Sequence, residues 1–145
     1  MSYQLSAPIK RYNYLSAETA AAYHEVAVKL GLSDSVMMVL YIIYDRGGVC
    51  LLGEIPRLSG IPKQTVNSAL RKMESDGILR MEAVDGKKKK VHLTEAGMTL
   101  AEGTVLRLMA LEDAVFAGWS QEEQKTYLAL TQRYLEEFRE KTKEL

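Results

Sequence analysis

The chain has 145 residues, of which 47% are hydrophobic and 26% are charged, so it is long enough for a compact domain and too apolar to be disordered. Its nineteen basic and nineteen acidic residues give no net charge, and its single cysteine excludes an internal disulfide and a cysteine-based zinc cluster. No apolar run is long enough to cross a bilayer and the N-terminus lacks the apolar core of a signal peptide, so we expect a cytoplasmic protein without a membrane partner.

Capping residues divide the first part of the chain into helices. Ser16 predicts the start of a helix that ends at Gly31. Ser33 predicts the start of a second helix, which is apolar on nearly all sides and should therefore be buried. A short helix is expected at about 52–59, where Gly60 ends it.

The middle of the chain predicts a helix followed by a β-hairpin. Pro62 suits the beginning of a helix, and the pattern indicates that this helix covers 63–75. Two short extended stretches follow at 78–84 and 88–93. The dipeptide Asp85-Gly86 lies between them and is a strong hairpin signal.

The C-terminal part predicts two helices. Thr94 can cap a long helix over 95–117, in which Gly103 marks a bend or a close packing contact. Ser120, with a glutamate three residues later, forms a capping box for a last helix that runs to about Lys143. The expected fold class is therefore mainly α with a small β-hairpin (α+β).

The helix at 63–75 carries the pattern that indicates a function. On a helical wheel its apolar residues fall on one face, which should be buried: Val66, Ala69, Leu70 and Met73. The opposite face is polar and has no acid at its centre: Gln64, Ser68, Arg71 and Ser75, flanked by Thr65, Asn67 and Lys72. Gln and Asn can pair with adenine and Arg with guanine, so this face suits the major groove of DNA.

The hairpin adds positive charge beside this helix. Residues 57–90 contain nine Lys or Arg against four Asp or Glu, a net charge of +5, whereas 91–145 carry −4 and 1–56 carry −1. Lys87 to Lys90 follow directly after the predicted turn. A lysine run can simply keep an exposed hairpin soluble, but beside a polar recognition-type helix it favours contact with nucleic-acid phosphates.

Two segments resemble the recognition helix and the wing of the MarR family of bacterial regulators. They are GIPKQTVNSALRKMESDGIL, residues 60–79, and DGKKKKVHLTEAG, residues 85–97. The resemblance implies a winged helix-turn-helix over 33–94 and a helical dimerisation region formed by 1–32 and 95–145. It further implies a homodimeric transcriptional regulator, in most such proteins a repressor, that binds a near-palindromic site in double-stranded DNA.

The resemblance also assigns residues to the DNA contact. The base-reading positions would be Gln64, Thr65, Asn67, Ser68 and Arg71. The phosphate-contacting positions would be Lys63, Lys72, Lys87, Lys88, Lys89 and Lys90. The family wing usually reads Asp-x-Arg, whereas this chain has Asp85-Gly86-Lys87 and so lacks the forked guanidinium. Pro62 stands where a Ser or Thr cap is usual.

A homodimer is also indicated by the last predicted helix. Its apolar residues recur at helical spacing and need a partner surface: Tyr127, Leu130, Tyr134 and Phe138. The alternative within one chain is that this helix folds back on residues 16–30.

The resemblance further implies a small aromatic or phenolic effector bound in a cleft. The candidate lining residues are Tyr12, Tyr14, His24, Met37, Met38 and Tyr41. A stripe of Met and aromatic residues on a buried helix is also the ordinary pattern of core packing.

Other functions remain as alternatives. A winged-helix protein-interaction module without DNA binding would carry acids or bulky apolar residues on the outer face of 63–75, and the sequence has none at its centre. A thiol redox sensor would use Cys50, whose apolar neighbours favour an inert buried thiol. We find no phosphate loop, nucleophile elbow or metal-ligand spacing, so we expect neither an enzyme nor a bound metal or cofactor.

Overall fold

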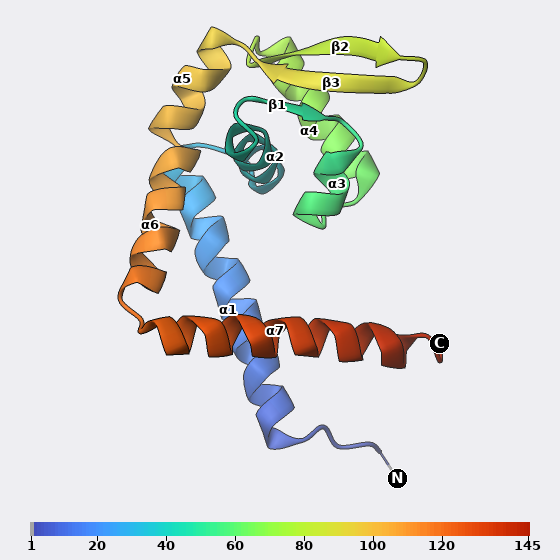
Figure 1. The fold of residues 1–145 in the computed structure, drawn as a ribbon, viewed down its shortest axis with the longest axis vertical. Coiled ribbons are helices and arrows are strands. Elements are labelled where there is room, and N and C mark those ends of the chain that lie inside the picture. The colour runs from blue at the N-terminus through green and yellow to red at the C-terminus, as the bar shows by residue number, and fades with distance from the viewer. Residues whose placement is uncertain (1) are drawn as a thin grey trace. The chain divides into compact units, whose positions relative to one another are not determined.

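The computed structural model describes residues 2–145 and confirms the mainly helical fold with a small antiparallel sheet (Figure 1). The helices are α1 Ala7–Leu30, α2 Asp34–Asp45, α3 Glu54–Ser59, α4 Lys63–Ser75, α5 Glu95–Gly103, α6 Val105–Ala117 and α7 Gln121–Thr142. The strands are β1 Val49–Leu51, β2 Leu79–Asp85 and β3 Lys88–Leu93. The chain divides into two compact units, one up to residue 108 and one from 109 to 145, which are described separately.

Helix α1 begins earlier than the sequence predicted. Its N-cap is Ser6, and Pro8 lies in its first turn, so Ser16 is an interior residue and the prediction that it caps the helix is wrong. Proline suits the first turn because its backbone nitrogen has no hydrogen to leave unpaired there. The predicted end is confirmed, since Gly31 closes the helix in a left-handed conformation with φ of 71°.

Helix α2 forms the centre of the first unit, as its apolar sequence predicted. The Ser33 hydroxyl accepts a hydrogen bond from the Val36 backbone N–H at 3.2 Å and caps the helix. Half of its twelve residues are buried, and it packs against α1, α3, α4, α5 and the sheet (Figure 1). The helix-turn-helix and the hairpin are therefore mounted on one shared core.

The sheet has three strands in the order β1-β3-β2, all antiparallel. The hairpin of β2 and β3 was predicted, whereas β1 was not. Strand β1 is only three residues long, and its central residue Cys50 pairs with Val91 of β3. Three residues are too few to show the alternation by which a strand is recognised in a sequence.

The single helix predicted over 95–117 is wrong, because the chain breaks it into α5 and α6. The break lies at Thr104, which has φ of −127° and ψ of −84° and whose hydroxyl donates to the Leu100 carbonyl oxygen at 2.6 Å. The preceding Gly103, which the sequence marked as a bend, is the last residue of α5. Glycine weakens a helix at this point, and threonine diverts a hydrogen bond to its own side chain.

The second unit consists of the end of α6 and all of α7. The predicted capping box is present, since Ser120 and Glu123 exchange hydrogen bonds of 2.9 and 3.0 Å. Phe116, Trp119 and Tyr127 form a cluster of edge-to-face rings at the junction of the two helices. No residue of α7 is buried.

Among the helices of residues 2–145, no single one has both the length and the apolar character to cross a bilayer. Helices α1 and α2 meet these criteria only as a pair, and they bend by 85° between them.

Candidate nucleic-acid interface

Helix α4 has the two faces that the sequence predicted. Its inner face is buried against the core and consists of Val66, Ala69, Leu70 and Met73. Pro62 is the N-cap and supplies no side-chain hydrogen bond, although its carbonyl oxygen accepts from the Val66 N–H at 3.0 Å. Burial of four apolar side chains therefore fixes the rotation of the helix and leaves its polar face outward.

The outer face of α4 is accessible. Gln64, Thr65, Ser68 and Arg71 are exposed and Asn67 is half-buried. The Ser68 hydroxyl donates to the Gln64 carbonyl oxygen at 3.1 Å, and the Arg71 guanidinium donates to the Ser68 oxygen at 3.4 Å. One guanidinium nitrogen is thus held along the helix, while the remaining donors stay available to a ligand.

The turn that joins α3 to α4 depends on Gly60. This residue has φ of 70°, a left-handed conformation that glycine adopts without strain. The Ser59 hydroxyl then accepts from the Ile61 N–H at 3.1 Å and closes the turn. The two short helices and their tight turn have the layout of a helix-turn-helix.

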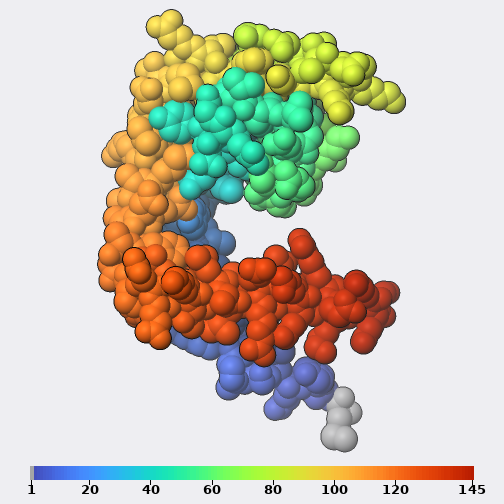
Figure 2. All heavy atoms as spheres, viewed as in Figure 1, coloured from blue at the N-terminus to red at the C-terminus, as the bar shows by residue number. Residues whose placement is uncertain are grey.

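The β2–β3 hairpin projects from the first unit as a wing (Figure 2). Its turn contains Gly86 with φ of 52°, and a register shift between Ala83 and Asp85 leaves Val84 as a bulge. Lys87, Lys88 and Lys89 are exposed. Lys90 differs from these three, because it is half-buried where β3 pairs with both neighbouring strands.

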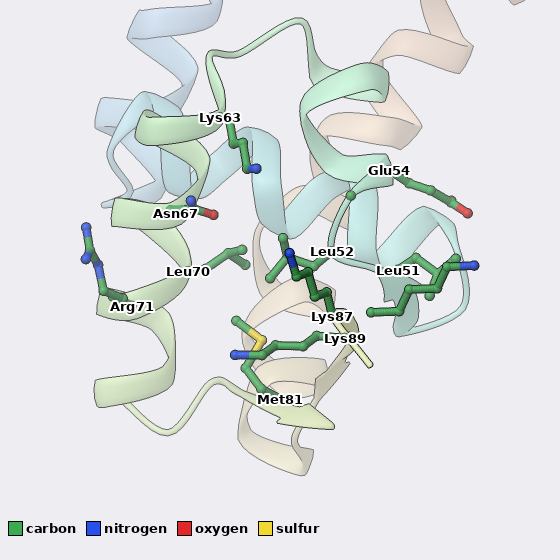
Figure 3. Close-up of a pocket in the computed structure, with 12 residues that line it drawn as sticks. Leu51, Leu52, Glu54, Lys63, Asn67, Leu70, Arg71, Met81, Lys87 and Lys89 are labelled. Carbon is green, nitrogen blue, oxygen red and sulfur yellow. The ribbon is translucent and has the colours of Figure 1, made fainter. Parts of the chain in front are cut away.

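A groove of about 620 Å³ runs between α4 and the hairpin (Figure 3). It brings together polar and basic side chains of both elements, namely Lys63, Asn67, Arg71, Lys87, Lys88 and Lys89. Of the five predicted base-reading residues, Asn67 and Arg71 line this groove, whereas Gln64, Thr65 and Ser68 lie outside it. Four of the six predicted phosphate-contacting lysines line it.

Two predicted lysines lie outside the groove, and four apolar residues inside it were not predicted. Lys72 forms an ion pair with Asp76 at 3.3 Å, and Lys90 is held in the strand. The floor of the groove is formed by Leu51, Leu52, Leu70 and Met81. Leu51 and Leu52 come from the unpredicted β1 and the turn after it, so no pattern in the sequence connected them with α4.

The segment after the hairpin connects the wing firmly to α5. The Thr94 hydroxyl accepts from the Gly97 N–H at 3.0 Å and donates to the Gly77 carbonyl oxygen at 2.6 Å. The Thr94 N–H donates to the Ile78 carbonyl oxygen at 3.0 Å. One threonine thus caps α5 and holds the beginning of β2 against it.

The six candidate effector-binding residues lie on two helices. Three are exposed on α1 (Tyr12, Tyr14 and His24), and three belong to α2 (Met37, Met38 and Tyr41). The His24 Nδ1 lies 2.9 Å from the Asp34 carboxylate and so connects α1 to the first turn of α2. Met37 is part of the core. Their role in effector binding stays a prediction.

Cys50 has the environment of an unreactive thiol. Its side chain is buried, with 6% exposure, and its Sγ contacts the Leu51 carbonyl oxygen at 3.5 Å. Burial raises the pKa of Cys50 to about 11, the negative charge of Glu54 adds to this rise and Arg46 opposes it. The thiolate is therefore scarce at neutral pH, which disfavours a redox-sensing role.

We expect iodoacetamide to leave Cys50 unmodified in the folded protein at pH 7. Alkylation requires the thiolate, and a pKa two units above the usual value lowers the thiolate fraction about a hundredfold. Labelling should accelerate as the pH approaches 11 and become complete after unfolding in guanidinium. Mass spectrometry at successive times measures both, and rapid labelling at pH 7 would restore the redox-sensor alternative.

Among residues 2–145, no three His, Cys, Asp or Glu side chains gather in a way that could hold a metal ion.

Comparison by sequence finds a similarity to a known family over part of the chain. A family model described as the MarR family matches residues 30–89, which extend from the end of α1 into β3. None of the curated protein sequences matches the chain.

Solved structures share the fold at low sequence identity. A MarR family regulator from Neisseria meningitidis, NMB1585, is 21% identical with a TM-score of 0.79, over 94% of this chain and 96% of that one. MepR of S. aureus, solved with DNA, is 17% identical with a TM-score of 0.71, over 93% and 99%. Bordetella bronchiseptica BpsR, whose DNA binding is regulated by 6-hydroxynicotinic acid, is 19% identical with a TM-score of 0.66, over 85% and 97%.

The helix-turn-helix of α3 and α4, together with the β2–β3 wing, makes this chain a winged helix-turn-helix protein. The resemblance predicted from residues 60–79 and 85–97 is confirmed, because the MarR family model matches residues 30–89 of this chain.

Proposed function

We propose that the chain regulates transcription by binding double-stranded DNA through α4 and the wing. The observation that carries this proposal is the groove between them, whose walls combine hydrogen-bonding side chains of α4 with three exposed lysines of the hairpin. Helix α4 has 13 residues and a length of about 20 Å, which suits a major groove. The wing lysines lie where they can contact phosphates beside that groove.

Base contacts are assigned to the exposed face of α4, and phosphate contacts to its flank and the wing. Gln64, Thr65, Asn67, Ser68 and Arg71 would read base edges. Lys63 and the wing lysines that line the groove would bind phosphates. The DNA-bound structure of MepR, which shares this fold, supports such a complex.

We further propose that the protein acts as a homodimer. Apolar side chains of α1, α6 and α7 are exposed, among them Val28, Leu111 and Phe138 with 65%, 62% and 54% exposure. A 22-residue helix that buries no residue needs a partner surface, and a second copy supplies an identical one. Residues 1–32 and 95–145 would form the dimer, and 33–94 would bind DNA.

A dimer sets the form of the operator. Two copies of α4 about 34 Å apart would reach successive major grooves, so the site would be near-palindromic. Repression would follow where such a site overlaps a promoter. The regulation of BpsR by 6-hydroxynicotinic acid supports release by a small aromatic ligand.

The test is selection of bound duplexes from random DNA, followed by affinity measurements on the selected site. We expect a two-fold symmetric sequence, and sedimentation at micromolar concentration should give a dimer. A monomer in sedimentation, or a pool without sequence enrichment, would reject the corresponding part of the proposal.

Arg71→Ala is expected to weaken binding to the selected site by roughly 1–3 kcal/mol and to relax the preference at one base position in each half-site. The reason is that arginine reads guanine with two donors, which alanine lacks. Arg46→Ala is the matched control, since Arg46 is also exposed but pairs with Glu54 and lies outside both the groove and the proposed dimer region. An equal loss in both variants would contradict a base-reading role for Arg71.

A further inference from the structure

The floor of the groove between α4 and the wing is more apolar than a DNA-binding surface requires. Leu51, Leu52 and Met81 are half-buried and Leu70 is fully buried, and they are the apolar side chains that line the groove. The Leu52 N–H donates to the Lys89 carbonyl oxygen at 2.9 Å, so the floor is fixed to the sheet. Side chains of this kind offer nothing to a phosphate, but they suit a flexible aliphatic chain.

The rim of the groove carries a strong excess of positive charge. Five of its lining residues are Lys or Arg, and the only acid among them is Glu54. The Glu54 carboxylate forms an ion pair with Arg46 at 3.7 Å, and Figure 3 shows it directed away from the groove. In the same view Lys63 and Lys87 point into the groove from its two walls. A ligand seated on the floor therefore meets ammonium groups at the rim.

We propose that this groove binds a single-chain amphipathic anion, a free fatty carboxylate of medium chain length. The alkyl chain lies on Leu52, Leu70 and Met81, and the carboxylate meets Lys63 and Lys87 at the rim. Among the lining residues there is no aromatic side chain against which a flat ring would stack.

The bound carboxylate would exclude DNA directly. It occupies the space between α4 and the wing and neutralises lysines that would otherwise bind phosphates. This consequence rests on the proposed function, whereas binding of the fatty anion itself does not.

The test uses the full chain labelled with ¹³C at the methionine methyl groups and titrated with dodecanoate below its micelle concentration. The Met81 signal, assigned from Met81→Leu, should shift and saturate, whereas that of the core residue Met37 should stay in place. Each buried methylene contributes about fourfold to affinity, so dodecanoate should bind at least about tenfold more tightly than octanoate. A Met81 signal that does not move would overturn the proposal.

Three further measurements test the chemistry of the ligand. Lys63→Glu combined with Lys87→Glu should lower dodecanoate affinity at least about tenfold, because both rim charges reverse. The matched control, Lys29→Glu combined with Lys125→Glu, should leave the affinity unchanged. Dodecyltrimethylammonium, which has the opposite charge, should not bind. Benzoate that shifts Met81 as strongly as dodecanoate would show that the groove takes an aromatic ligand and would overturn the assignment.

Competition is measured separately, with the selected duplex. Dodecanoate should lower its affinity in proportion to occupancy of the groove, and excess duplex should return the Met81 signal to its original position. If dodecanoate binds and the duplex affinity does not change, the exclusion is wrong. If the chain binds no duplex, the proposed function fails while the Met81 titration still decides the ligand.

Discussion

Replacing Lys87, Lys88 and Lys89 together with alanine is expected to weaken binding to all duplexes, selected and random alike. These three exposed lysines face the groove from the wing, where they would bind phosphates rather than bases. Removing one lysine–phosphate interaction reduces the slope of log affinity against log salt by about 0.9. The slope should therefore fall by about three per protomer, and affinity in 0.1 M salt should fall at least about a hundredfold.

The adjacent Lys90 provides a control in the same hairpin. It has the same charge, but it is half-buried opposite Glu82 in the sheet and lies outside the groove. Lys90→Ala should change the salt slope by less than any one of the other three. Titrations at several salt concentrations measure this difference. A slope that is unchanged in the triple variant, or reduced equally by Lys90→Ala, would show that the wing does not bind phosphates in this way.

Local sequence signals predicted helix α4 and the wing almost completely. Helix α4 begins after Pro62 and buries the four apolar residues that the wheel placed on one face, and the hairpin turns at Asp85-Gly86. The start, the end and the buried face of each of these elements depend on residues close to it in the sequence. Proline, glycine and the spacing of apolar residues determine them, and all three can be read from a single sequence.

The sequence predictions failed where two residues could each begin the same helix, or where an element depends on a strand far away in the sequence. Ser16 resembles a cap, but Pro8 begins the helix earlier. Strand β1 exists because it pairs with β3, about forty residues away in the sequence, and its own three residues carry no strand pattern. The apolar floor of the groove combines β1, α4 and β2, so only the tertiary structure brings Leu52 and Met81 together.

The same distinction applies to the candidate effector residues. The helical period predicted that Met37 lies on a buried helix. It could not decide whether the side chain packs in the core or lines a ligand cleft, and the structure packs it in the core. For the groove, the sequence predicted the polar residues but not the apolar ones. Side-chain chemistry alone pointed to Asn67 and Arg71, whereas the apolar surface beside them appears only in the structure.

Gly97→Ala is expected to destabilise the protein more than the addition of a methyl group anywhere else in α5. A Cβ at this position would overlap the Ile78 carbonyl oxygen, a backbone atom that cannot rotate away. That oxygen also accepts the Thr94 N–H, so a hydrogen bond holds it in place. Overpacking typically destabilises by about 1–3 kcal/mol, and a backbone overlap belongs at the upper end, which corresponds to a fall in melting temperature of about 10 °C for a chain of this size.

Gly103→Ala is the matched control, because it adds the same methyl group to the same helix. Nothing lies within 4 Å of a Cβ at Gly103, so the substitution should be neutral or stabilise α5 by up to about 1 kcal/mol. Thermal unfolding at one protein concentration compares the two variants. Similar melting temperatures would contradict the close approach of α5 to β2.

The contact of α5 with Gly77 and Ile78, just before β2, fixes the base of the wing. Thr94 caps α5 and ties it to the beginning of β2, and Gly97 lets the two backbones touch, so the hairpin is clamped where it leaves the core. Gly97→Ala should therefore also loosen the base of the wing. Amide hydrogen exchange should accelerate in 78–80 and 91–94 more than in α4, whereas a uniform acceleration would indicate global destabilisation alone.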